Sequence, residues 1–258
     1  MEASRVPDDD ESSFVTLLER WVERPDGTTE LLNVPLTPKD FLNPRYGDKW
    51  LQGRAHSDST HDLFELLKRH FRSQPDVVVM SDVQHRFGPG LDQPCPDISV
   101  VRGVRDPRVI DSSFNARKVG ALPCLLIEVV SPGDARIREV DEKDKVRLYQ
   151  SVGIPEYLLV WPPGIGRQDQ RFRLWGYRLG PGGRYRPIDL DEKERLLSET
   201  TGLWFAVSPG GDRIDVFDAK TGQRLLSPIE EEDARKAAEE ELARLRTELD
   251  QYKKASGS

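Results

Sequence analysis

Cysteine and histidine are scarce in this chain of 258 residues. Its two cysteines, Cys95 and Cys124, are too few for a disulfide framework, and with only four histidines they are too few for a zinc cluster. We therefore interpret both cysteines as small buried residues. These absences exclude a disulfide scaffold and a zinc finger as the basis of the fold.

Long hydrophobic runs are also missing. No apolar stretch approaches the ~20 residues of a membrane-spanning helix, and the acidic N-terminus has neither the basic region nor the apolar core of a signal peptide. With 36% hydrophobic and 32% charged residues, we expect a soluble, cytoplasmic protein with no membrane partner. The length suits one large domain with appendages, or two small domains.

The net charge of −7 is concentrated at the two ends of the chain. Residues 1–12 carry a charge of −4 and residues 229–258 carry −3, so the segment between them is neutral. A neutral body neither indicates nor excludes a nucleic-acid-binding protein, because local basic patches can supply the phosphate contacts.

The pattern divides the chain into three parts. Residues 1–13 form an acidic arm that we expect to be disordered, residues 14–228 form the main domain, and residues 229–258 form a charged helical tail. In the tail, Ala238, Leu242, Leu245, Leu249 and Tyr252 repeat at spacings of 4, 3, 4 and 3. This short heptad seam fits either a solvated helix or a weak coiled coil that forms a homodimer.

Helical and strand patterns alternate through the main domain. Residues 14–21 fit a short helix or strand, and the prolines and glycines of 25–44 indicate loops. Ser59, with Asp62 three residues later, resembles a capping box and predicts a helix over about 58–73. A second helix is expected over 137–152, and the expected strands cover 77–80, 84–87, 96–101, 125–130, 156–161, 171–178, 184–188, 203–207 and 213–218.

Glu128 interrupts the apolar run of residues 125–130, which has the composition of a central strand buried on both faces. A carboxylate at such a position is unfavourable unless another group binds it. In the helix over 137–152, Asp141, Lys145, Leu148, Tyr149 and Val152 share one stripe, so Asp141 and Lys145 should face the sheet while Lys143 faces solvent. The sequence therefore predicts a polar cluster against the Glu128 strand.

Asp97 joins this cluster if its strand pairs with the Glu128 strand, because paired strands lie about 4.8 Å apart. Two carboxylates and a backbone carbonyl suit a hard cation such as Mg²⁺ or Mn²⁺. A cation held in this way polarises a phosphoryl oxygen and activates water, and a nearby ammonium group can orient that water. The chemistry indicated is hydrolysis of a phosphodiester bond.

Four motifs carry a family resemblance: Pro96-Asp97, Ile127-Glu128-Val129-Val130-Ser131-Pro132, Lys145-Val146-Arg147-Leu148-Tyr149 and Gly153-Ile154-Pro155-Glu156-Tyr157. Their order and spacing resemble the Uma-type bacterial restriction endonuclease family of the PD-(D/E)XK nuclease superfamily, over about residues 36–162 and more loosely beyond. The resemblance implies a restriction-endonuclease-like α/β core, with a mixed β-sheet flanked by helices, to which an antiparallel β region and a C-terminal helix are added.

The resemblance also implies site residues and a cofactor. Asp97 and Glu128 would bind Mg²⁺ or Mn²⁺, with the carbonyl of Val129 as a third ligand. The superfamily pattern expects a lysine two residues after Glu128, where this chain has Val130. In this family the lysine comes from the following helix, and Lys145 is the residue that fits.

Several further residues are candidates with competing interpretations. His61 and Glu65 can add a ligand or base, although an exposed position near the start of a helix explains His61 better. Asp141 can orient Lys145 or simply favour the start of its helix. Basic side chains that can contact nucleic acid include Arg102, Arg105 and Arg108, which follow the Asp97 strand, and the arginines of residues 167–186, among them Arg171 and Arg173. A solvated hairpin explains the second group equally well.

Two functions are consistent with these residues. The first is a metal-dependent endonuclease that acts on nucleic acid, with DNA the expected form. The second is a catalytically inactive protein that keeps the nuclease fold and binds nucleic acid or another protein. The two differ in the effect of replacing Glu128, which should abolish cleavage in the first case and leave binding intact in the second.

Overall fold

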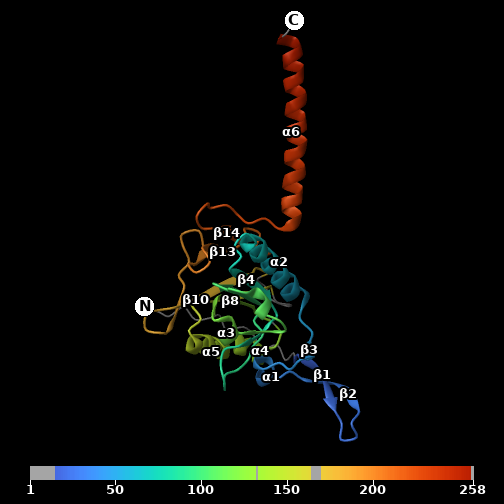
Figure 1. Cartoon of the computed structure of the whole chain (residues 1–258), viewed down its shortest axis with the longest axis vertical. Coiled ribbons are helices and arrows are strands. Elements are labelled where there is room, and N and C mark those ends of the chain that lie inside the picture. Colours follow the sequence, from blue (N-terminus) through green and yellow to red (C-terminus); the bar gives the residue numbers. More distant parts are fainter. Residues whose placement is uncertain (1–14, 132, 164–169, 257–258) are drawn as a thin grey trace.

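A six-stranded mixed β-sheet forms the centre of the molecule (Figure 1). The computed structural model describes residues 15–131, 133–163 and 170–256. The strand order of the sheet is β11 (Tyr185–Pro187), β10 (Arg173–Leu179), β9 (Glu156–Trp161), β8 (Pro123–Val129), β6 (Ile98–Arg102) and β4 (Val77–Ser81). Within this sheet, as far as the structure describes the chain, β8 and β9 pair in parallel and the other neighbours are antiparallel. The expected mixed sheet of an α/β fold is thus confirmed.

The strand register puts two acidic residues on one face of this sheet. Ile98 lies opposite Ile127 in the β6–β8 pair, so Asp97, directly before β6, comes level with Glu128. Because side chains alternate along a strand, Asp97 and Glu128 share a face with Leu126 and Val130, while Ile127 and Val129 point to the other face. The pairing on which the approach of Asp97 to Glu128 depended is therefore present.

Different elements cover the two faces. On one face, α2 (Arg54–Phe71) packs Leu63, Leu67 and Phe71 against the sheet, next to the small sheet formed by β12 (Arg195–Ser198), β13 (Leu203–Val207) and β14 (Ile214–Asp218). On the other face, Leu148 and Tyr149 of α5 (Lys145–Val152) pack on the core. The acidic pair therefore lies under the helix that carries Lys145.

A widened turn interrupts the helix that the sequence predicts over 137–152. It comprises α4 (Ala135–Glu139), the π-helical turn η2 (Val140–Asp144) and α5. The N–H of Lys145 donates to the carbonyl of Val140, five residues earlier, as in a π-helix. The helix ends at Gly153, whose φ of +89° suits a glycine cap.

Other local expectations were wrong. Helix α2 begins after Gly53, and the hydroxyl of Ser59 donates to the carbonyl of Ala55 within the helix, so Ser59 is not its cap. The segment expected to form loops contains β2 (Thr29–Pro35) and α1 (Pro38–Leu42), with β3 (Lys49–Trp50) shortly after it. Strands β2 and β3 both pair with β1 (Leu17–Glu23). Strand β12 was not expected, and both cysteines are only half-buried.

The remaining elements lie at the edges of the core. A parallel pair joins β5 (Gln84–Arg86) to β7 (Ser113–Asn115), and two short helices, η1 (Pro107–Val109) and α3 (Ala116–Val119), flank β7. Helix α6 (Pro228–Ser256) extends away from the body (Figure 1). The predicted acidic arm, residues 1–13, lies outside the described residues.

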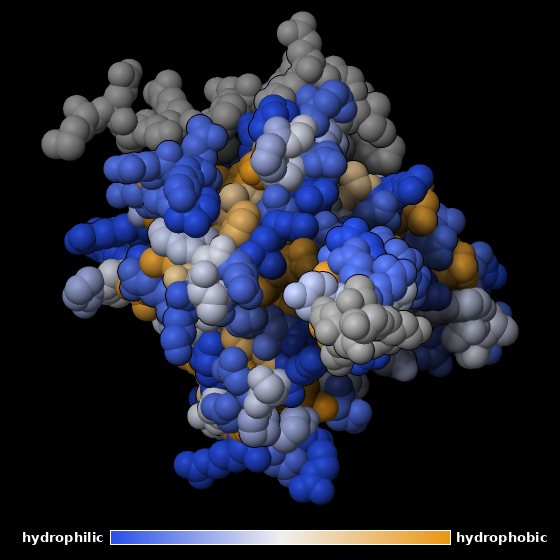
Figure 2. All heavy atoms as spheres, turned by 90° about the horizontal axis from the view of Figure 1, so that it is seen from above, coloured by the Kyte–Doolittle hydropathy of each residue, from blue (hydrophilic) through white to orange (hydrophobic). Residues whose placement is uncertain are grey.

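The face of the molecule seen from above is mainly hydrophilic (Figure 2). Figure 2 views the molecule from above and shows hydrophobic residues on this face in small, separate patches. Within the part of the chain that the structure describes, no helix has the length and apolar character needed to cross a membrane.

Candidate active site

Asp97 and Glu128 meet where β6 begins and β8 ends. Oδ2 of Asp97 accepts a hydrogen bond of 2.6 Å from the N–H of Val129, and Oε2 of Glu128 accepts one of 3.4 Å from the N–H of Asp97. Asp97 is 6% exposed and Glu128 is 1% exposed. The backbone of each strand thus holds the carboxylate of the other strand.

Lys145 reaches this pair from the start of α5. Its Nζ lies 2.9 Å from Oε2 of Glu128 and 2.8 Å from Oδ1 of Asp141, and the lysine is fully buried. The ring of Phe41, in α1, lies 4.3 Å from the same Nζ. Lys145 and Asp141 therefore face the sheet as their spacing predicts, and Lys143 is exposed.

Two buried tyrosines support the cluster. The hydroxyl of Tyr149 donates to Oε1 of Glu128 at 3.0 Å, and the hydroxyl of Tyr157 donates to the carbonyl of Asp141 at 2.9 Å. Tyr149 lies in α5 and Tyr157 in β9, so helix and sheet each contribute one. These contacts fix the orientation of Glu128 and the backbone of the π-helical turn at Asp141.

His56 is a member of the cluster that the sequence did not reveal. It lies in the first turn of α2, is 4% exposed, and places Nε2 3.3 Å from Oδ2 of Asp97. Its Nδ1 is buried with no hydrogen-bond partner among the described residues. The apparent capping box at Ser59 predicted a helix that began after His56. The helix in fact begins after Gly53, so His56 lies within its first turn.

Burial and charge act in opposite directions on the pKa values of these groups. Burial raises the pKa of Glu128 well above its ordinary value although Lys145 lowers it, and burial raises that of Asp141 to about 6. For Asp97, burial is outweighed by His56 and Lys145, so its pKa is lowered. Burial lowers the pKa of Lys145 and of His56, but the nearby carboxylates outweigh it and raise both.

The donor set fits a divalent cation. Three carboxyl groups and two basic groups lie together, so full ionisation leaves a net buried negative charge that favours binding of a cation. No group of three or more His, Cys, Asp or Glu side chains is arranged to hold a metal among the described residues. Mg²⁺ does not require one, since it is commonly held by one or two carboxylates and keeps several waters.

A cleft of about 1060 Å³ adjoins the cluster. Asp82 and Cys95 lie in its wall near Asp97, and Tyr46, Lys49 and Arg86 line other parts of it. Desolvation and the Asp97 carboxylate raise the pKa of Asp82. The cleft is thus lined by neighbours of the cluster, Asp82 and Cys95, rather than by the buried carboxylates themselves.

The structure does not bring every predicted residue to this cluster. His61 is exposed, as its surface interpretation predicts, and Glu65 lies near Lys68. Arg102 lies at the opposite end of β6 from Asp97, where it contacts Gln74, Thr201 and the Phe71 ring, and Arg105 follows it.

Two of the other arginines lie closer to the end of the sheet where β8 and β9 finish, which is the end that carries Glu128. Arg173 is opposite Trp161, at the edge where β8 and β9 end, and its guanidinium lies 5.5 Å from the Trp161 ring. Arg171, two residues earlier, is exposed and donates to the carbonyl of Pro209.

Comparison with known proteins identifies the family. The model of the Uma2 family, described as "Putative restriction endonuclease", matches residues 50–208. A solved structure from Anabaena variabilis ATCC 29413, described as a "putative nuclease belonging to DUF820", is 18% identical, with a TM-score of 0.41, over 65% of this chain and 91% of that one. No curated protein matches. Because the matched segment contains Asp97, Glu128 and Lys145 and more than half of the chain, this protein belongs to the Uma2 family.

Proposed function

We propose that this protein is a metal-dependent endonuclease that hydrolyses phosphodiester bonds of nucleic acid, with DNA as the expected substrate. One observation carries the proposal: Lys145 lies 2.9 Å from Glu128, whose backbone neighbour Val129 binds Asp97. This arrangement supplies two carboxylates and an ammonium group where apolar packing would be more stable. Family membership supports the same reaction class.

In this proposal, each residue of the cluster has a distinct role. Asp97, Glu128 and the carbonyl of Val129 would hold Mg²⁺ or Mn²⁺, and the bound cation would supply Lewis-acid activation of a phosphoryl oxygen and of water. Lys145 orients the attacking water and offsets the charge that grows on the phosphate. Asp141 positions Lys145 through their 2.8 Å ion pair, and His56 holds the carboxylate of Asp97.

The adjoining cleft is the proposed approach for the substrate. Asp97, Glu128 and Lys145 are each less than a tenth exposed, and Phe41 of α1 lies against the Lys145 ammonium. In this proposal a phosphate enters beside Asp82, and the Phe41 ring moves off the Lys145 ammonium before Lys145 contacts the phosphate. Lys49 and Arg86 in the cleft, and Arg171 and Arg173 at the sheet edge, are candidates for phosphate contacts.

The test is cleavage of a substrate panel by the wild-type protein and two variants. Supercoiled, single-stranded and modified DNA, and an RNA, are incubated in Mg²⁺ and in Mn²⁺ with the wild type, Glu128→Ala and Lys145→Ala. We expect cleavage only by the wild type, abolished by a chelator, with each variant at least about 100-fold slower. Cleavage by all three proteins would indicate a contaminating nuclease. Cleavage by the wild type and by Lys145→Ala, but not by Glu128→Ala, would show that the lysine is wrongly assigned.

A binding protein without catalytic activity is the second candidate. It is favoured by the closed state of the cluster, in which Lys145 is already paired with two carboxyls and is fully buried. In that case no substrate is cut, and Glu128→Ala retains the nucleic-acid or protein binding of the wild type. A fluorescence-polarisation titration with labelled DNA and RNA, made beside the cleavage assay, separates the two functions.

A further inference from the structure

Helix α6 is a long single helix whose described ion pairs to the body lie near its base. Its 29 residues span about 43 Å, and Figure 1 shows it extending away from the other elements. Glu231 forms an ion pair with Arg69 of α2, and Glu230 pairs with Arg224 at 2.8 Å. Every residue from Glu231 to Leu249 is exposed, so the described residues cover no face of this part of the helix.

The exposed surface of α6 carries an apolar seam. Ala238, Leu242, Leu245 and Leu249 follow one another at spacings of four, three and four residues, and the three leucines are 49%, 49% and 51% exposed. Outside this seam the helix is strongly charged, with ion pairs such as Arg235–Glu239 and Lys236–Glu232 along its surface. Leucines at heptad a and d positions are the residues that bury themselves against a second helix.

We infer that the seam of α6 binds the same seam of a second copy of this chain, in a parallel two-stranded coiled coil. With Leu242 and Leu249 at a positions and Leu245 at d, Glu241 and Glu248 occupy g positions and Arg246 occupies an e position. In a parallel pair, the g residue of one helix faces the e residue of the next heptad in its partner. Glu241 of each copy then faces Arg246 of the other.

Charge opposes the antiparallel arrangement. An antiparallel pair brings the g positions of one helix against the g positions of the other, which places Glu241 and Glu248 side by side. Like charges in contact disfavour association, whereas the parallel arrangement pairs opposite charges twice. The charge pattern therefore favours the parallel direction over the antiparallel one.

The apolar seam begins some distance from the base of α6. Glu231 and Arg235, which precede Ala238 in the same heptad register, are charged, so apolar contact begins about ten residues, or ~15 Å, from the base of the helix. The two helices therefore need no apolar contact at their bases, next to the bodies. Because the seam is only about two heptads long, we expect reversible, concentration-dependent association.

Sedimentation equilibrium over a wide concentration range tests the inference. We expect the wild type to pass from monomer to dimer, and Leu245→Asp to weaken association at least tenfold. Thr247→Asp is the matched control, because it adds the same charge at the outward f position and should change the dissociation constant less than twofold. Circular dichroism of both variants as monomers establishes that the helix itself is retained.

A charge exchange tests the direction of the pair. Glu241→Lys and Arg246→Glu should each associate with itself at least threefold more weakly than the wild type, because each places like charges together. An equimolar mixture of the two variants should recover the wild-type dissociation constant within about twofold, since the mixed dimer restores both opposite-charge pairs. This recovery is specific to the parallel arrangement.

Other outcomes overturn the inference. A wild type that stays monomeric at the highest soluble concentration, or an oligomer that Leu245→Asp leaves intact, excludes the seam as the interface. A trimer or larger assembly excludes the two-stranded form. Failure of the mixed variants to recover association, when each alone is weakened, excludes the parallel direction.

Discussion

Lys145 holds together a group of carboxyls that would otherwise repel one another inside the protein. Replacing it by methionine keeps the length of the side chain but leaves Glu128 and Asp141 without their cation, which lies 2.9 and 2.8 Å from them. Removing one partner of a buried ion pair typically costs about 3–5 kcal/mol. We expect Lys145→Met to lower the free energy of unfolding by that amount at pH 8, measured by urea denaturation.

The same variant should be less destabilised in acid. Burial raises the pKa of Glu128 and of Asp141, so the folded state binds protons more readily than the unfolded state, and its stability falls as the pH rises. Without the ammonium group, the fall of stability with rising pH becomes larger. The loss of unfolding free energy caused by Lys145→Met should therefore be smaller at pH 5 than at pH 8. Lys143→Met is the control, because Lys143 forms an exposed ion pair with Glu139 and should matter by less than about 0.5 kcal/mol. An equal cost at both pH values would contradict this account.

His85 should make the protein sensitive to mild acid. It is fully buried, its Nδ1 lies 2.6 Å from the carbonyl of Val83, and burial lowers its pKa from 6.5 to about 4. Because the folded pKa lies below the unfolded one, the stabilisation is complete above pH 6.5 and is lost as the pH falls towards 4. We expect the free energy of unfolding to fall by about 3 kcal/mol over this range from His85 alone.

His85→Asn tests this prediction, since asparagine keeps a donor near the carbonyl of Val83 and does not titrate. The variant will be less stable overall because the space beside Phe114 is not refilled. Its unfolding free energy should nevertheless depend less on pH between 6.5 and 4 than that of the wild type. Parallel pH profiles for the two proteins would show that His85 is not the titrating group.

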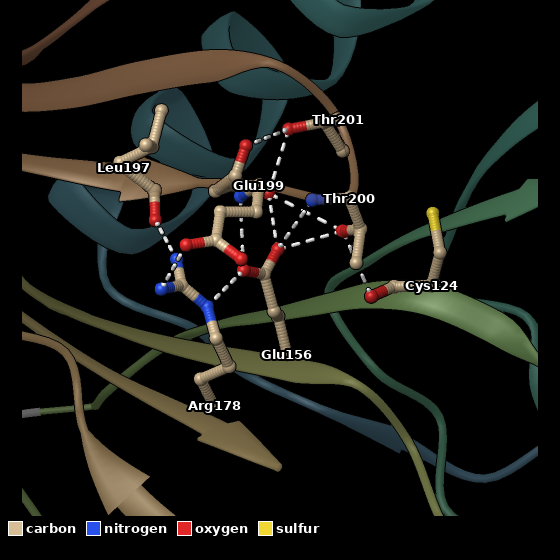
Figure 3. Close-up of polar contacts among 8 residues, drawn as sticks. Cys124, Glu156, Arg178, Leu197, Glu199, Thr200 and Thr201 are labelled. Atoms are coloured by element: carbon tan, nitrogen blue, oxygen red, sulfur yellow. Dashed lines mark hydrogen bonds and ion pairs between the residues drawn. The ribbon is translucent and has the colours of Figure 1, made fainter. Parts of the chain in front are cut away.

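At the scale of elements, a buried carboxylate joins the central sheet to the small sheet β12–β13–β14. Glu156, at the start of β9, accepts hydrogen bonds from the hydroxyls of Ser198 and Thr200 at 2.5 and 2.6 Å and from the guanidinium of Arg178 at 2.9 Å (Figure 3). The hydroxyl of Thr200 also lies 3.1 Å from the carbonyl of Cys124 in β8. One side chain thus connects three strands and a turn.

Glu156→Gln should loosen this junction. The variant keeps the shape of the side chain but replaces one acceptor oxygen by an NH₂ group, a donor that faces other donors. It also removes the negative charge that binds Arg178. We expect a loss of about 3 kcal/mol in unfolding free energy, since hydrogen bonds to buried charged groups contribute about 1.5–3 kcal/mol each. Glu199→Gln also removes a carboxylate that pairs with Arg178, but Glu199 is 61% exposed, so a loss of under about 1 kcal/mol is expected. Equal losses would show that burial of Glu156 is not the cause.

The elements that the sequence predicted best are those whose pattern depends only on near neighbours. Strand β9 was predicted residue for residue, and α5 ends at Gly153 as its glycine indicates. His56 was missed because Ser59 and Asp62 resemble the start of a helix, whereas α2 begins after Gly53 and includes His56. Arg102 was proposed as a nucleic-acid contact because it follows the Asp97 strand, but it lies at the far end of β6, where it contacts Gln74 and Thr201. The approach of Asp97 to Glu128 was expected only if their strands paired, because Asp97 begins one apolar run and Glu128 interrupts another; the β6–β8 pairing meets this condition.

At the scale of the whole molecule, α6 and the body should be energetically separable. The hydrogen bonds and ion pairs that join them involve Glu230 and Glu231, and the half-exposed ion pairs there contribute little each. A chain that ends at Asp233 keeps both residues. We expect its unfolding free energy, measured at a concentration where the wild type is monomeric, to match that of the wild type within about 0.5 kcal/mol.

At higher concentration the full chain should gain stability and the shortened chain should not, because dimer formation stabilises the folded state by mass action. A shortened chain that is less stable at every concentration would mean that α6 belongs to the folding unit of the body, and the concentration dependence of the full chain would then need another interface.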